Sequence, residues 1–160
     1  MSAIKNSNLA ITITEIWYTY PETPFSIVNY NDRFHKAIEY EQTHTLWNRI
    51  YATPGSASFE EKEKETAAGI LFEQKLKFLY PGEDDSDTSF FDSVRRPVII
   101  KIIFSDGLPK MFGSAEKPAK CERLSKTSAK ESASECTFSC LSSEPAWWIS
   151  QETEIIPDND

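Results

Sequence analysis

Apolar and polar residues alternate along much of this chain with a period of two. The clearest case is GILFEQKLKFLYPG, residues 69–82, in which every second residue from Ile70 to Tyr80 is apolar except Gln74. Most of the residues between them are charged. Successive side chains of a strand point to opposite faces, so this pattern predicts a half-buried strand that ends at Pro81-Gly82.

Shorter segments repeat the pattern. LAITITEIW (residues 9–17), RFHKAIEYE (33–41) and TLWNRIYAT (45–53) each predict a strand, although a helix is the alternative for residues 33–41. The first segment changes its apolar phase between Glu15 and Ile16, as a β-bulge would require. About eight strands joined by short turns are expected.

One predicted strand, VIIKIIF at residues 98–104, is apolar on both faces, with Ile99 and Ile103 flanking Lys101 on the second face. Such a strand is covered on both sides, either by its own chain or by another subunit, and both alternatives stay open here. The Asp106-Gly107 pair that follows predicts a two-residue hairpin turn of type I′.

Helix is scarce. DTSFFDSVRR (residues 87–96) predicts one short helix, capped by Asp87 or Ser89 and stopped by Pro97. The charged stretch SFEEKEKETAAG (58–69) has no apolar stripe, so we interpret it as an exposed strand or arm, with a helix as the alternative. We expect it to be mobile in an isolated subunit and to pair with a neighbour; whether it belongs to the core sheet stays open.

The expected fold class is therefore mainly β: an antiparallel β-sandwich or partly closed barrel with one short helix. We expect a single β-rich domain over residues 1–160, with residues 157–160 as a disordered acidic tail. The chain has 17 basic and 25 acidic residues and a net charge of -8, which disfavours specific binding to nucleic acid. It has no apolar run long enough to span a membrane and no apolar leader, so we expect a cytoplasmic product without a membrane partner.

Candidate chemistry adds little. Cys121, Cys136 and Cys140 are an odd number without a CxxC pair, and His35 and His44 are the sole histidines, so small buried hydrophobes are favoured over a metal site. No GxGxxG, P-loop or GxSxG motif occurs, so no cofactor and no catalytic residue is assigned, and we do not expect an enzyme.

The order of several segments resembles a known group of proteins. GILFEQKLKFLYPG is followed by an apolar strand with a DG turn, then KMFGSAEKP, a strand ending in TFSC, and an aromatic close containing proline. Over residues 11–149 this order resembles small uncharacterised virion structural proteins of Bacteroidetes tailed phages and prophage-like elements. The resemblance implies a ring-forming tail subunit (tail tube or terminator) or a head-to-tail connector. It also implies a homo-oligomer such as a hexamer, partnered by other virion proteins and assembled in the bacterial host cytoplasm.

Two alternatives remain, a monomeric ligand-binding β-barrel and an enzyme of unassigned class. The ligand-binding alternative would use the four tryptophans Trp17, Trp47, Trp147 and Trp148. The residues expected at a subunit interface belong to the charged stretch, the doubly apolar strand and the tryptophan pair. They are Phe59, Glu60, Lys62, Lys64, Ile99, Lys101, Ile103, Trp147 and Trp148.

Overall fold

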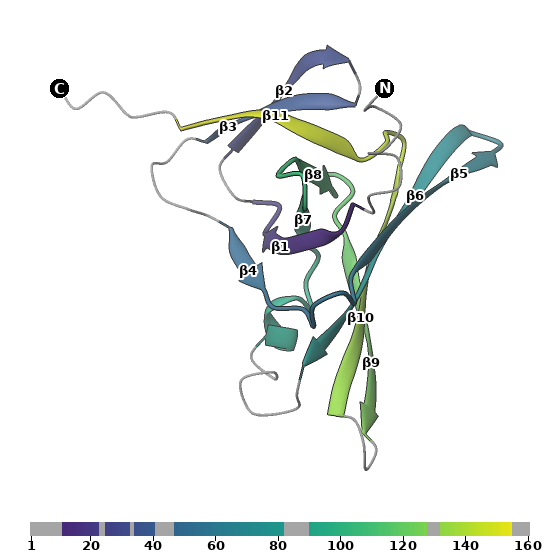
Figure 1. Ribbon diagram of the computed structural model, residues 1–160. Coiled ribbons are helices and arrows are strands. Elements are labelled where there is room, and N and C mark those ends of the chain that lie inside the picture. The colour runs from purple at the N-terminus through teal and green to yellow at the C-terminus, as the bar shows by residue number, and fades with distance from the viewer. Residues whose placement is uncertain are drawn as a thin grey trace, which may run out of the picture.

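The computed structural model describes residues 11–22, 25–32, 34–40, 47–81, 90–127 and 132–154. These residues hold a helix of one turn at residues 90–93 and the following strands (Figure 1): β1 (Ile13–Thr19), β2 (Phe25–Asp32), β3 (His35–Tyr40), β4 (Asn48–Ile50), β5 (Ser58–Thr66), β6 (Gly69–Pro81), β7 (Ile99–Phe104), β8 (Pro109–Phe112), β9 (Lys120–Thr127), β10 (Ser132–Ser142) and β11 (Trp147–Glu154).

The strands form two sheets. One has seven strands in the order β2-β3-β11-β8-β7-β1-β4, and the other has four in the order β5-β6-β10-β9. All neighbours are antiparallel except β3 and β11, which run parallel. The larger sheet curls into a half-barrel, and the smaller sheet extends beside it (Figure 1). The predicted fold class, a β-sandwich or partly closed barrel with one short helix, is confirmed.

The main core lies between the two sheets. Ile16, Ile100 and Ile102 of the larger sheet belong to one buried cluster with Leu76 and Phe138 of the smaller sheet. The alternation in β6 and β10 directs one face of each strand to this cluster, as the sequence predicts; the residues that reach it are Leu76, Phe78 and Tyr80 of β6 and Cys136, Phe138 and Cys140 of β10. Cys136 and Cys140 are buried there as well, also as predicted.

A second cluster lies on the opposite face of the larger sheet. It contains Ile38, Tyr40, Trp47, Ile99, Met111, Trp147 and Ile149. The Trp47 indole N–H donates to the Tyr40 hydroxyl at 2.6 Å, and that hydroxyl donates to Glu152 Oε2 at 3.2 Å. Lys101 Nζ lies 3.4 Å from Glu152 Oε1, and its burial lowers the pKa of Lys101 although Glu152 opposes the shift. Strand β7, between β8 and β1, is therefore covered on both faces by its own chain.

The turn after β7 differs from the predicted type I′. Gly107 has φ of 86°, but no other residue of the loop has positive φ, whereas type I′ needs two such residues. Gly107 N donates to Phe104 O at 2.8 Å and Phe104 N donates to Leu108 O at 3.3 Å, which defines a three-residue loop with glycine in the left-handed position. Asp106 Oδ1 accepts from Leu108 N at 3.0 Å, so the aspartate caps the loop and needs no positive φ.

The charged stretch is an ordinary edge strand. Strand β5 pairs with β6 from Ser58↔Lys77 to Thr66↔Gly69, so the helix alternative and the expectation of a mobile arm are both wrong. A complete backbone ladder and an ion pair from Lys64 to Glu73 at 2.8 Å hold β5 without an apolar stripe. Other expectations shift less. The β-bulge in β1 lies between Ile13 and Glu15, slightly earlier than predicted.

Residues 33–41 and 45–53 also follow the strand prediction where they are described, as β3 and the shorter β4. The helix at residues 90–93 is present, but its predicted caps, Asp87 and Ser89, lie outside the described residues, as do His44 and the acidic tail at residues 157–160.

Candidate functional site

The β5–β6 hairpin projects beyond the smaller sheet. Strand β10 accompanies β6 as far as Phe72, which pairs with Ser142, whereas β5 and β6 continue together to Thr66 and Gly69. The far end of the hairpin is therefore a two-stranded ribbon, and it stands clear of the rest of the described chain in Figure 1. The Thr66 hydroxyl donates to Gly69 O at 2.7 Å and braces the turn.

The outer face of this hairpin has balanced charge. Glu73 Oε2 lies 2.8 Å from Lys64 Nζ, and Glu73 Oε1 lies 3.0 Å from Lys75 Nζ. Hydrogen bonds from Lys64 and then from Lys75 lower the pKa of Glu73 to about 2. The surface is solvated and needs no further partner.

The inner face of the hairpin is different at its far end. Glu63 and Glu65 point to the same face as Glu61, because they are separated from it by two and four residues along a strand. Within the described part of the chain neither forms an ion pair. Ile70, which pairs with Glu65 across the hairpin, is 51% exposed. This distal inner face, Glu63, Glu65 and Ile70, thus combines negative charge with an uncovered apolar side chain.

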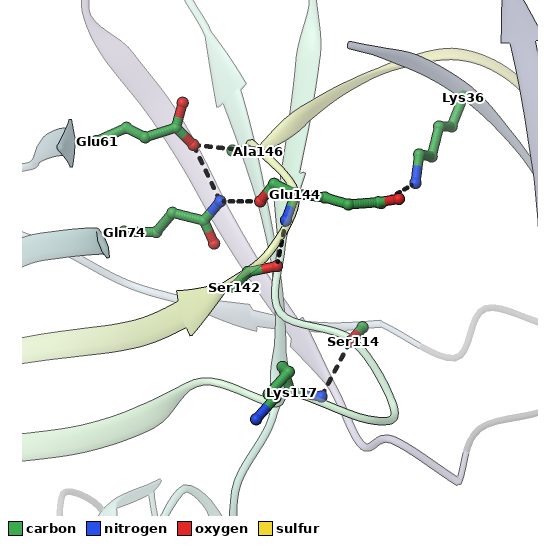
Figure 2. Close-up of polar contacts among 8 residues, drawn as sticks. All are labelled: Lys36, Glu61, Gln74, Ser114, Lys117, Ser142, Glu144 and Ala146. Atoms are coloured by element: carbon green, nitrogen blue, oxygen red, sulfur yellow. Dashed lines mark hydrogen bonds and ion pairs between the residues drawn. The ribbon is translucent and has the colours of Figure 1, made fainter. Parts of the chain in front are cut away.

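The base of the hairpin is fixed to the larger sheet. Glu61 Oε2 accepts from the Ala146 amide at 2.6 Å and from Gln74 Nε2 at 2.9 Å (Figure 2). Gln74 Nε2 also donates to Glu144 O at 3.2 Å, and the Glu144 carboxylate pairs with Lys36 Nζ at 2.6 Å. Because this network runs from β5 and β6 through the turn before β11 to β3, it sets the angle at which the hairpin leaves the body.

A cleft of about 470 Å³ lies beside this base. Its walls include Phe59 of β5, Phe104 of β7 and Trp148 of β11, and Lys110 of β8 lies among them. Lys110 Nζ is 4.7 Å from the centroid of the Trp148 ring and 5.5 Å from that of Phe59. The Phe104 and Trp148 rings are 5.6 Å apart. We call this site the Lys110 cleft.

The Lys110 ammonium lacks a paired carboxylate in the described part of the chain. Burial lowers the pKa of Lys110, and the nearest opposing influence is the charge of Glu61. Glu61, however, already accepts two hydrogen bonds from Ala146 and Gln74. Two ring faces lie beside the cation, and a carboxylate from outside would add a charge-assisted hydrogen bond to this arrangement.

A larger depression of about 650 Å³ lies on the outer face of the smaller sheet, with Lys64, Glu73 and Lys75 in its lining. Glu116, Lys117, Lys120 and Glu122 also line the depression. No aromatic residue of the described chain does, so it lacks the aromatic walls that distinguish the Lys110 cleft.

The structure separates the residues that the sequence groups as an interface. Phe59 and Trp148 meet at the Lys110 cleft, and Glu60, Lys62 and Lys64 are exposed on β5. Ile99, Lys101 and Trp147 are buried within the chain and Ile103 is half-buried, so the intramolecular alternative accounts for the doubly apolar strand.

The four tryptophans do not share a cavity. Trp47 and Trp147 belong to the second cluster, with Trp17 packed against it, and Trp148 alone of the four lines the cleft. The four tryptophans are therefore divided between the second cluster and the cleft, and the ligand-binding alternative stays a prediction. The sequence did not predict Phe104 and Lys110 as site residues. Each is a single side chain beside a turn and belongs to no recognisable motif.

No family model, curated protein or solved structure matches this chain. The residues that the structure describes contain no group of three or more His, Cys, Asp or Glu side chains that could hold a metal ion. Within the same residues, no helix has the length and apolar character needed to cross a membrane. The site is therefore interpreted from its own geometry and charge.

Proposed function

We propose that this protein is a structural subunit that assembles into a homo-oligomeric ring through its β5–β6 hairpin. The observation that carries the proposal is the projecting end of the hairpin, whose inner face is exposed beyond the edge of β10. In the finer form implied by the resemblance to phage virion proteins, the ring is part of a bacteriophage tail, as tube or terminator, or a head-to-tail connector.

The exposed end of the hairpin is a weakly stable element. A two-stranded hairpin has little stability in water unless another surface covers one of its faces. Here the far end exposes Ile70 and two carboxylates that form no ion pair with the described part of the chain. A neighbouring subunit that covers this face would stabilise the ribbon and bury the isoleucine.

The edge of β5 argues for contact through a face. Alternating glutamate and lysine from Glu61 to Glu65 discourage pairing with the edge of another chain. A contact that joins the hairpin of one copy to a different surface of the next is heterologous, and its repetition closes a ring when the rotation permits. A net charge of -8 would also let DNA pass such a ring without strong binding.

The test is to shorten the hairpin without disturbing its base. Replacing residues 64–71 with an Asn-Gly dipeptide joins Glu63 directly to Phe72, its partner across the two strands, by a two-residue turn. Light scattering coupled to size exclusion should show a ring for the wild type and a monomer for the shortened variant. The melting temperature of the variant should stay within a few degrees of the wild-type monomer, because Phe59 and Glu61 are retained.

The control is Ala67→Ser, which changes the turn but keeps the length of the hairpin and should leave assembly intact. A wild-type protein that stays monomeric at high concentration overturns the proposal, and a shortened variant that still assembles excludes the hairpin as the interface. The virion role has a separate test. Genes for a portal, tape measure or tail sheath should lie beside this gene, whereas a metabolic operon would contradict that role.

A further inference from the structure

Two surfaces of the described chain, the hairpin end and the Lys110 cleft, complement each other in charge and in apolar character. We propose that the distal inner face of the hairpin, Glu63, Glu65 and Ile70, docks into the Lys110 cleft of a second copy of this chain. The inference rests on the proposed assembly and identifies the two surfaces that meet.

Charge is the first match. The cleft holds an ammonium group between the Phe59 and Trp148 rings with no carboxylate paired to it in the described part of the chain. The hairpin end holds Glu63 and Glu65, which lack cationic partners there. A carboxylate placed beside Lys110 would form a charge-assisted hydrogen bond in a partly desolvated site, where such bonds are stronger than at an open surface.

Apolar shape is the second match. Ile70 pairs with Glu65 across the hairpin, so its side chain stands beside the carboxylate on the same face. The cleft likewise places apolar surface beside a charge, here a positive one, because the aromatic walls of Phe104 and Trp148 adjoin the Lys110 ammonium group. Its volume of about 470 Å³ is enough to accept an isoleucine together with one glutamate.

Reach shows that the contact joins two molecules. Phe59 in the cleft wall and Glu65 at the hairpin end lie on the same strand, β5, six residues apart. At about 3.3 Å per residue, an extended strand places them roughly 20 Å from each other. A hairpin therefore cannot enter its own cleft. The end of one hairpin must meet the base of another, and this contact is heterologous when it repeats head to tail around a ring.

The test uses reversed charges in two variants and their mixture. Lys110→Glu makes both the cleft and the hairpin end negatively charged. The double variant Glu63→Lys/Glu65→Lys makes both positively charged. Each variant alone should require a protein concentration at least about 30-fold higher for assembly, as expected for an interfacial ion pair that loses its partner. In an equimolar mixture every hairpin can find a cleft of opposite sign, so the mixture should assemble at wild-type concentrations.

The controls separate a specific contact from a general effect of charge. Lys120→Glu and Glu116→Lys reverse exposed charges outside the hairpin and the Lys110 cleft and should assemble like the wild type. Circular dichroism and melting temperature establish that each variant is folded. If Lys110→Glu does not fold, Lys110→Gln takes its place: it should weaken assembly alone, and the reversed hairpin variant should not rescue it.

The outcomes distinguish this docking from the proposed function. A monomeric wild type overturns the assembly itself. Assembly by both reversed variants overturns the docking and leaves the ring intact, and variants that fail alone and in mixture show that the two surfaces do not meet. If the variants assemble and 2-naphthoate quenches tryptophan fluorescence of the wild type but not of Lys110→Gln, the cleft binds a small aromatic anion instead, and the docking is wrong.

Discussion

Strands β7 and β5 have opposite chemistry and opposite surroundings. Strand β7 is apolar on both faces and lies between β8 and β1, with Ile100 and Ile102 fully buried. Strand β5 is charged on both faces and has β6 as its one neighbour in the sheet. From sequence, both are candidates for a subunit interface. The structure covers the first with its own chain and leaves the second exposed.

The difference shows what an apolar sequence can reveal. It indicates that both faces of a strand must be buried, but not whether the same chain or another subunit buries them. The seven-stranded sheet has a buried cluster on each face, one of them shared with the smaller sheet, so β7 needs no partner molecule. Strand β5 keeps its place through backbone pairing and through ion pairs on its outer face. Its uncovered inner face is therefore the stronger candidate for contact with another copy.

The largest expected effect is on β7. Ile102→Ala should lower the free energy of unfolding by about 2–5 kcal/mol, because it leaves a cavity at a fully buried position between the sheets. Glu63→Ala on β5 should change it by less than about 0.5 kcal/mol, because that side chain is solvated. Chemical denaturation under monomeric conditions measures both. A cost at Glu63 as large as that at Ile102 would show that the hairpin end packs against its own chain.

A smaller effect is expected at the turn that joins β7 to β8. Gly107→Val should lower the free energy of unfolding by about 1–3 kcal/mol, because valine is strained at the φ of 86°. The cost arises from the backbone, since a Cβ at this position would meet no atom within 4 Å. Asp106→Asn keeps an acceptor for the Leu108 amide and serves as the control, with little change in stability. Equal losses in the two variants would show that the cost does not come from the φ of residue 107.

Long alternating segments were predictable from the sequence. The pattern of β6 and of β10 determines which residues enter the core, and the structure confirms it. The pairing of β1 with β4 and the parallel pairing of β3 with β11 were not predictable, because they depend on register between segments far apart in the chain.

The candidate site follows the same rule. The sequence identifies Phe59 as an aromatic residue on an exposed strand and Trp148 as one near the end of the chain. It does not predict that the two side chains line the same cleft. The Lys110 cleft draws its walls from β5, β7, β8 and β11, so it exists only once both sheets have formed. A local pattern cannot report such a site, since no two of these strands except β7 and β8 are adjacent in the sequence.

The smallest expected effect concerns acid and the outer face of the hairpin. Glu73 lies between Lys64 and Lys75, and its pKa falls from an ordinary 4.5 to about 2. Because the folded chain releases this proton more readily than the unfolded chain, the ion pairs stabilise the protein above about pH 4.5, and the stabilisation is lost as the pH falls toward 2. Glu73→Gln should therefore be less stable than the wild type near neutral pH, and this difference in stability should disappear as the pH falls over this range.

Lys62→Met, which removes a charge outside the triad, should show no such convergence with the wild type. Thermal unfolding of the three proteins at a series of pH values measures the gap; a constant gap for Glu73→Gln would show that the ion pairs do not stabilise β5 against β6.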